Sequence, residues 1–302
     1  MNYIADLHNH TNASDGEYTP TKLVQKGKAL GLQAIGVTDH DTLNGLDEAV
    51  AAGEQFDIQV LTGVEVSLRF RRPYFTGTLH YLLYIPRDIL ADADFRAMAT
   101  AVFQQGRGHG LVQARVDAIN AEFGVGTKDA VLKRPLTTAE IEALSPNVTR
   151  RHFAVALKEN HGLNREQINM LIGNDSRAYL PSGIDPAQLT PLLHKYPRLL
   201  RIFAHPAAGS YPGKSLYNEI LPPIEIVDKL MPEFLDDDLL GLDGLEVHYP
   251  GHAPEHRLLM AEWAQKYGLL VSGGSDCHDA VERLLGVVGV SQAELDAIMA
   301  RL

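Results

Sequence analysis

The chain has 302 residues, of which 45% are hydrophobic and 22% charged, so it is long enough to bury a large core. It carries 27 Lys and Arg against 38 Asp and Glu, and the net charge of −11 argues against broad electrostatic binding of duplex nucleic acid. The single cysteine excludes an internal disulfide, and no apolar run is long enough to span a membrane. We therefore expect a cytoplasmic protein with no membrane partner.

Apolar runs rich in Val, Ile, Leu and Tyr alternate with helical patterns along most of the chain, as is typical of βα units around a mainly parallel sheet. Helices are predicted over residues 20–30, with Thr19 as the N-cap, and over Pro254–Tyr267, with Gly268 as the stop. Seven strands are predicted, at residues 3–7, 34–38, 59–64, 79–84, 200–204, 244–247 and 269–272. This number of strands favours a barrel over an open sheet.

From about residue 89 to residue 180 the strand pattern gives way to helical segments. We interpret residues 89–180 as a helical insertion that selects the substrate, within a barrel formed by residues 1–88 and 181–302. Residues 207–238, which contain Tyr211-Pro212-Gly213-Lys214, Pro222-Pro223 and an acidic run, predict no regular element. Long loops of this kind are usually functional or flexible, and the role of this one stays open.

Histidine and carboxylate residues gather near the ends of the predicted strands. Asp6, His8 and His10 alternate at the end of the first strand, so their side chains point to one side. Further clusters follow the later strands: Asp39-His40-Asp41, Glu65, His80, His205, Glu246 with His248, and Asp276 with His278. Because αβ-barrel enzymes build their sites at this end of the barrel, we expect a metal site here. Imidazole and carboxylate ligands suit Zn²⁺, Mn²⁺ or Fe²⁺.

In chain order the motifs are Asp6-x-His8-x-His10, Ser14-Asp15-Gly16, Thr38-Asp39-His40-Asp41, Gly63-x-Glu65, His80, His205-Pro206 and Ser275-Asp276-x-His278. This series resembles the PHP (polymerase and histidinol phosphatase) family. The resemblance implies a distorted seven-stranded (β/α) barrel with a trinuclear metal centre that hydrolyses phosphate esters. The form of Ser14-Asp15-Gly16 and the insertion motifs at residues 149–154 and 178–181 are more similar to the branch of nucleoside 3′,5′-bisphosphate phosphatases and 5′-to-3′ exoribonucleases.

The resemblance also implies the ligands of up to three divalent ions, Mn²⁺, Zn²⁺ or Fe²⁺. It assigns the first ion to His8, His10, Glu65 and Asp276, the second to Glu65, His80 and His205, and the third to Asp15, His40 and His278. Three such ions carry more charge than the three carboxylates neutralise, so the centre would attract phosphate although the chain is acidic. A hydroxide shared by the first two ions would be the nucleophile.

Three more residues are candidates for a catalytic role near these ligands. Asp6 and Asp39 are predicted to orient ligating imidazoles through the second ring nitrogen, and strand-end capping is the alternative. His248 is predicted to be a general acid or a substrate contact. His252, close to the start of a predicted helix, is expected at the surface.

The insertion supplies the candidates for substrate binding. Arg107, Arg150 and Arg151 could bind a second phosphate through their guanidinium groups, and the alternative is that they are exposed on helix surfaces. Tyr179 is predicted to stack on a nucleotide or to hydrogen-bond with it, and a place in an interfacial core is the alternative.

The favoured function is metal-dependent hydrolysis of a nucleoside 3′,5′-bisphosphate to the 5′-monophosphate, with short 5′-phosphorylated RNA as an additional or true substrate. Two alternatives stay open. One is a phosphatase for a non-nucleotide metabolite such as histidinol phosphate, and the other is a non-catalytic PHP module that binds metal. The complete ligand set argues against the last alternative, because burying so many polar groups without a function is costly.

Overall fold

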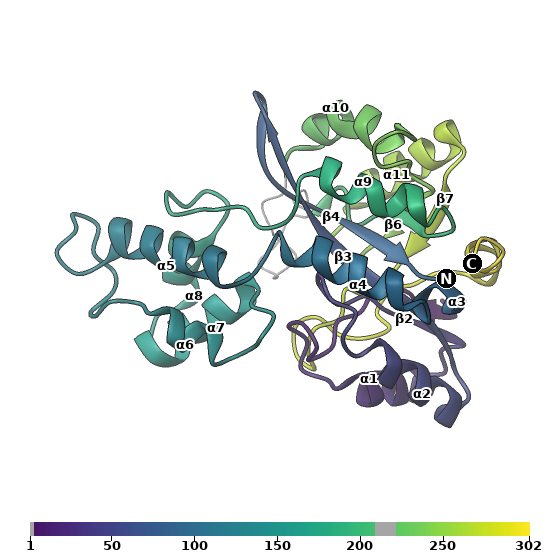
Figure 1. The fold of residues 1–302 in the computed structure, drawn as a ribbon, viewed down its shortest axis with the longest axis horizontal. Coiled ribbons are helices and arrows are strands. Elements are labelled where there is room, and N and C mark those ends of the chain that lie inside the picture. The colour runs from purple at the N-terminus through teal and green to yellow at the C-terminus, as the bar shows by residue number, and fades with distance from the viewer. Residues whose placement is uncertain (1–2, 209–221) are drawn as a thin grey trace.

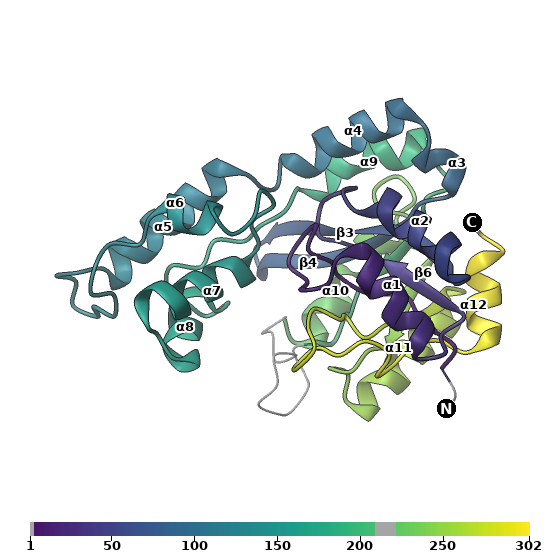
Figure 2. The ribbon, with the colours of Figure 1, turned by 90° about the horizontal axis from the view of Figure 1, so that it is seen from below.

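The computed structural model describes residues 3–208 and 222–302, so Tyr211-Pro212-Gly213-Lys214 lies outside the described residues. The described chain forms two bodies (Figure 1): a seven-stranded barrel surrounded by helices, and a group of helices that projects from it. Figure 2, turned by 90°, shows the same separation.

Seven strands form one sheet in chain order. They are β1 (Ala5–Asp6), β2 (Ala34–Val37), β3 (Gln59–Arg72), β4 (Phe75–Tyr84), β5 (Leu200–Phe203), β6 (Gly244–His248) and β7 (Leu270–Gly273). The backbone amide of Leu7, just after β1, donates to the carbonyl of Gly273 in β7 at 3.2 Å, so the sheet nearly closes on itself. The predicted seven-stranded barrel is confirmed.

The fourth strand departs from the expected parallel order, because β4 is antiparallel to both β3 and β5. Only Pro73 and Tyr74 separate β3 from β4, and so short a connection allows only an antiparallel pair. The resulting hairpin extends beyond the predicted strand ends. Buried Leu68 and Phe70 alternate there with more exposed arginines, a period-two pattern of a half-buried strand that the sequence reading missed.

Helices surround the barrel: α1 (Pro20–Ala29), α2 (Leu46–Phe56), α3 (Arg87–Leu90), α4 (Ala93–Gln104), α9 (Pro186–Lys195), α10 (Ile224–Leu235), α11 (Pro254–Tyr267) and α12 (Gln292–Met299). Two predicted helix ends are confirmed. The Thr19 side chain accepts the Lys22 amide at the start of α1, and Gly268 ends α11 with a φ of 66°. Helix α10 lies within residues 207–238, for which no regular element was predicted. Its flanking and internal prolines conceal the helical period.

The projecting body contains α5 (His109–Phe123), α6 (Thr138–Glu142), α7 (Arg150–His161) and α8 (Arg165–Ile172). These helices enclose a hydrophobic cluster of their own, which includes Ile119, Phe153 and Leu171. In contrast, Phe95 and Phe103 of α4 belong to the main core of the barrel. The domain boundaries at residues 89 and 180 stay a prediction.

The chain crosses between the two bodies at two adjacent places. The amide of Gly183 donates to the carbonyl of Gly106 at 3.0 Å, and a Cβ on Gly106 would lie 2.5 Å from the Gly183 carbonyl carbon. Gly183 also has a φ of 97°, which side chains rarely permit. The glycines therefore let the outgoing and returning chains pack closely beside the barrel.

Candidate metal centre

Histidine and carboxylate side chains from almost every strand meet at one end of the barrel. Four groups of them have possible ligand atoms that all lie within 4.8 Å of one another. These groups bring together every residue predicted as a metal ligand: His8, His10, Asp15, His40, Glu65, His80, His205, Asp276 and His278. Glu246, which was not among the predicted ligands, joins one of the groups.

The first group contains His8, His10, Glu65 and Asp276, the set that the family resemblance implies for one ion. His10 Nε2 lies 3.0 Å from Glu65 Oε2 and 3.1 Å from Asp276 Oδ1. His8 Nε2 lies 3.2 Å from the same Glu65 oxygen. All four residues are buried, and their nitrogen and oxygen atoms face a common point.

The second carboxylate oxygen of Glu65 faces a different pair of imidazoles. Glu65 Oε1 lies 2.8 Å from His80 Nδ1 and 2.9 Å from His205 Nε2. Strand pairing explains the first contact: Glu65 of β3 lies opposite Leu82 of β4, so His80 is its diagonal neighbour on the same face. Glu65 therefore lies between two ligand sets, as a bridging carboxylate would.

The third group contains His10, Asp15, His40 and His278. His278 Nε2 lies 3.4 Å from Asp15 Oδ1, and the rings of His10 and His278 stack with their centroids 4.2 Å apart. His278 Nδ1 lies 2.8 Å from the carbonyl of Asp276 and donates to it, which leaves the Nε2 lone pair directed toward Asp15.

The hydrogen-bonding state of the centre fits bound cations. Among the buried atoms of the described residues that have no hydrogen-bond partner, five belong to predicted ligands: His10 Nδ1, His40 Nδ1, Glu65 Oε2, His80 Nδ1 and His205 Nδ1. His40 Nδ1 and His80 Nδ1 lie 3.2 and 2.8 Å from Glu65 oxygens without hydrogen-bond geometry. Buried polar atoms normally find partners, so these atoms and the imidazole–carboxylate chemistry fit divalent metal ions.

The local field keeps the carboxylates of the centre ionised. Burial by itself raises the pKa of Glu65, but His80, His40 and His8 outweigh burial and hold this pKa well below its usual value. Burial also raises the pKa of Asp276, and Arg283 and His278 reverse that effect. Ionised carboxylates are the form that binds metal.

Glu246 forms hydrogen bonds with two residues of the centre, His8 and His205. The Nδ1–H of His8 donates to Glu246 Oε1 at 3.0 Å, and the backbone amide of His205 donates to Glu246 Oε2 at 2.8 Å. A carboxylate on one ring nitrogen fixes the imidazole and directs the other nitrogen to the metal. Glu246 lies near the end of a predicted strand, so its place at this end of the barrel was predictable, but this role was not.

Tyr249 and Arg283 are two further supporting residues that the sequence analysis missed. The Tyr249 hydroxyl and the Arg283 guanidinium donate to Asp276 Oδ2 at 3.1 and 2.8 Å. Asp276 Oδ1 is then left to face the histidines. No local pattern marks either residue, because each reaches Asp276 only through the packing of loops.

The structure does not support the prediction that Asp6 and Asp39 orient imidazoles. Asp6 accepts the amide and the hydroxyl of Ser275 at 2.9 and 2.6 Å, and burial raises its pKa to about 6. Asp39 accepts the amide and the hydroxyl of Thr11 at 2.7 and 2.6 Å. These short side chains are saturated by loop groups before they can reach a ring nitrogen. They hold the ligand-bearing loops, which was the alternative.

His248 is not brought to the centre. Its Nε2 lies 2.8 Å from Glu294 of α12, and none of the candidate ligand groups of the described residues includes it. The pairing of β6 with β7 is irregular between Glu246 and His248, so the alternation that would have placed both side chains on one face is broken. A catalytic role for His248 is therefore not supported. His252, expected at the surface, is buried.

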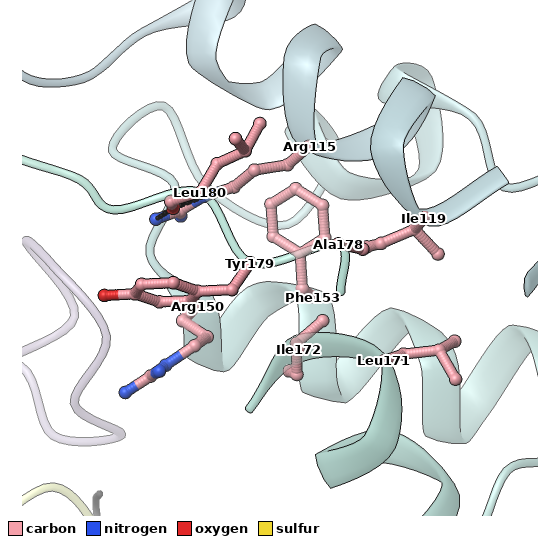
Figure 3. A pocket seen from close by; sticks show the side chains of 9 residues that line it. All are labelled: Arg115, Ile119, Arg150, Phe153, Leu171, Ile172, Ala178, Tyr179 and Leu180. Carbon is pink, nitrogen blue, oxygen red and sulfur yellow. Dashed lines mark hydrogen bonds between the residues drawn. The ribbon is translucent and has the colours of Figure 1, made fainter. Parts of the chain in front are cut away.

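A groove of about 1740 Å³ connects the centre to the projecting helices. Its lining includes Glu65, His80 and His205 at the centre, and Arg150 and Tyr179 on the insertion. Figure 3 shows the Arg150 guanidinium and the Tyr179 hydroxyl pointing in the same direction, away from the apolar residues around them. Arg150 also donates to the side chain of Asn174. The structure thus places both predicted substrate contacts on a path to the metal centre.

The other two arginines predicted to bind substrate, Arg107 and Arg151, form ion pairs with residues of the barrel. Arg107 Nε lies 2.5 Å from Asp41 Oδ2, and the Arg107 side chain is only 9% exposed. Arg151 pairs with Asp279 at 3.0 Å. Their guanidinium groups thus have anionic partners, while both residues also line the groove, so their role in substrate binding stays a prediction.

A model of the family described as "PHP domain" matches residues 6–180, which is more than half of the chain. Three curated proteins are similar over almost their whole length. A 5′-3′ exoribonuclease of Haemophilus influenzae is 28% identical over 278 residues, 90% of this chain and 89% of that protein. A 3′,5′-nucleoside bisphosphate phosphatase of Chromobacterium violaceum is 26% identical over 288 residues, 90% of this chain and 86% of that protein.

The third relative is a phosphoribosyl 1,2-cyclic phosphate 1,2-diphosphodiesterase of Eggerthella lenta, 26% identical over 295 residues, 93% of this chain and 96% of that protein. Among solved structures, a protein of Bifidobacterium adolescentis assigned as a metal-dependent phosphoesterase has a TM-score of 0.74 and 25% identity. The alignment covers 98% of this chain and 96% of that one. In residues 3–208 and 222–302, no helix is both long and apolar enough to cross a membrane.

Proposed function

This chain belongs to the PHP family and is a metal-dependent phosphoesterase, and we propose that its substrates are nucleotides. The reaction that fits best is removal of the 3′-phosphate from a nucleoside 3′,5′-bisphosphate. The observation that carries this proposal is the groove that joins the metal centre to Arg150 and Tyr179. A substrate with two phosphates and an aromatic base would contact residues at both ends of that groove.

The charges around Arg150 support an anionic substrate. Burial, with the like charges of Arg150 and Arg107, lowers the pKa of Arg115 to about 9. Arg115 donates from Nε and Nη2 to the carbonyl of Leu180, at 3.0 and 2.8 Å, rather than to a carboxylate. The guanidinium groups of Arg107, Arg115 and Arg150 thus lie close enough to repel one another, and a second phosphate bound here would relieve that repulsion.

The residues of the centre have separate tasks in the proposed reaction. Glu65, Asp276 and Asp15 supply the negative charge that holds divalent ions, and Glu246 fixes the ring of His8. When bound, such ions lower the pKa of a coordinated water and polarise the phosphoryl group. His80, with 18% of its side chain exposed, is the most exposed of the proposed ligands and borders the groove.

A second candidate substrate is short 5′-phosphorylated RNA, and the size of the groove favours it. Pockets for small ligands usually enclose about 300–1,000 Å³, whereas this groove has about 1740 Å³ and continues along α8. A dinucleotide or longer strand would fill that space better than one nucleotide. A single-phosphate metabolite such as histidinol phosphate would leave Arg150 without a phosphate to bind.

The test is turnover of Mn²⁺-supplemented protein on adenosine 3′,5′-bisphosphate, a short 5′-phosphorylated RNA and histidinol phosphate. The Asp276→Asn variant serves as the blank. Preference for the bisphosphate or the RNA, lost in the blank, supports the nucleotide proposal. Preference for histidinol phosphate contradicts it, and metal binding without turnover of any of the three moves the proposal to another phosphate ester.

A further inference from the structure

The insertion contacts the barrel beside ligands of one particular metal site. Asn147, just before α7, donates from its side-chain Nδ2 to the backbone carbonyl of His40 at 2.7 Å. His40 belongs to the third ligand group, with Asp15 and His278, and its Nδ1 also lies 3.2 Å from Glu65. A residue of the insertion therefore holds the loop that carries a proposed ligand of the third ion.

A buried ion pair fixes the next residue of the same loop. Arg107 Nε lies 2.5 Å from Asp41 Oδ2, with 9% and 3% of the two side chains exposed. The same guanidinium donates to the carbonyl of Val148 at 3.1 Å, so it ties the segment around Asn147 to Asp41. Asp41 has a φ of 48°, a backbone conformation that surrounding contacts must maintain.

Arg151 makes the third contact, beside the remaining two ligands. Its Nη2 lies 3.0 Å from Asp279, the residue after His278, and 3.7 Å from Glu17, two residues after Asp15. Asp279 Oδ1 also accepts the backbone amides of Val281 and Glu282 at 2.8 and 2.6 Å. Arg151 thus binds the carboxylate around which the loop after His278 is folded.

The ligands of the other two sites are fixed by the barrel. Glu65 and His80 lie within the β3–β4 hairpin. Glu246 holds His8 at 3.0 Å, and Tyr249 holds Asp276 at 3.1 Å in addition to Arg283, which belongs to the loop folded around Asp279. The dependence on the insertion is therefore concentrated at the group of Asp15, His40 and His278.

We propose that docking of the insertion determines the affinity of the third metal site, with Asn147, Arg107 and Arg151 as positioning residues. This inference rests on the ligand sets of the proposed function. Asn147 lies three residues before Arg150, the proposed contact of the second phosphate, and shares its segment. Binding of phosphate at Arg150 and binding of the third ion therefore favour the same position of this segment, and each should strengthen the other.

The experiment is a titration of metal-depleted full-length protein with Mn²⁺, in which the six-line EPR signal reports the free ion. Wild type should bind three ions. Asn147→Ala and Arg151→Ala should keep two of them and bind the third about 10-fold more weakly, as loss of groups that orient ligands typically does. Arg151→Lys keeps a cation opposite Asp279 and should retain most of the wild-type affinity.

The control is Arg134→Ala, which removes an ion pair with Glu140 inside the insertion, 2.8 Å long and remote from the barrel contacts. It should bind three ions like wild type. Unchanged affinities in both Asn147→Ala and Arg151→Ala overturn the inference, as do equal losses at all sites or only two ions in wild type. Wild type that binds no ion at all would overturn the proposed function as well.

Discussion

Glu246 and His8 form the hydrogen bond that organises the first metal site: His8 Nδ1 lies 3.0 Å from Glu246 Oε1, and both side chains are fully buried. Because this bond occupies Nδ1, His8 presents Nε2 to Glu65 and Asp276. The contact joins β6 to the loop after β1, two elements that are more than two hundred residues apart in the chain. Glu246 therefore supports the site without being one of its proposed ligands.

Replacing Glu246 with Gln should therefore weaken metal binding without unfolding the chain. The amide keeps the shape but loses the charge that stabilises the metal-facing imidazole, so the affinity for the first ion should fall about 10- to 100-fold. The measurement is kcat as a function of Mn²⁺ concentration. Glu294→Gln, which touches His248 outside the centre, is the matched control and should keep the wild-type metal dependence.

Loss of a ligand should have a larger effect than loss of its support. His8→Ala and Asp276→Asn should each reduce turnover about 100-fold or more even at saturating Mn²⁺, since the centre loses part of its coordination and of its negative charge. Circular dichroism should show wild-type helix content. Wild-type turnover in either variant would contradict the assignment of the first ligand set.

Arg150→Ala should separate binding of the second phosphate from chemistry. Loss of a charged hydrogen bond is worth about 1.5–3 kcal/mol, so KM for a nucleoside bisphosphate should rise about 10-fold or more. KM for a simple monoester should change much less, because that substrate has no second phosphate. Steady-state kinetics on both substrates check this, with Arg134→Ala as the control. Equal increases for the two substrates would remove Arg150 from second-phosphate recognition.

The ligands could be predicted from the sequence because they follow local rules. His8 and His10 alternate on one strand, and Glu65 and His205 lie in or directly after strongly apolar runs. Such local patterns determine where these side chains lie, whatever the packing of distant segments. The barrel itself was predictable for the same reason, since each strand is a short apolar run between helical segments.

The supporting contacts could not be predicted because they depend on packing between distant segments. Asp6 and Glu246 both precede imidazoles by two residues, yet loop amides saturate the first carboxylate and a ring nitrogen takes the second. A break in the β6–β7 pairing turns His248 away, and no residue pattern announces it. The bounds of the β3–β4 hairpin were readable in principle from its period of two.

The ring of His252 is buried and held in the neutral state. Its Nδ1 donates to the carbonyl of Val247 at 3.0 Å, and its Nε2 accepts the amide of Ala207 at 3.2 Å. Burial lowers its pKa to about 3, while the unfolded chain should titrate near 6.5. Between these two values the unfolded state binds the extra proton, so the free energy of unfolding should decrease as the pH falls below about 6.5.

At pH 5 this linkage should have removed about 2 kcal/mol relative to pH 7. Urea unfolding of metal-depleted protein at the two pH values measures the loss. In His252→Gln the drop between pH 7 and pH 5 should be smaller by that amount, whatever the absolute stability of the variant. The exposed His194, replaced by Gln in a control, should leave the drop unchanged. An equally steep drop in His252→Gln would assign the acid sensitivity to the histidines of the metal centre instead.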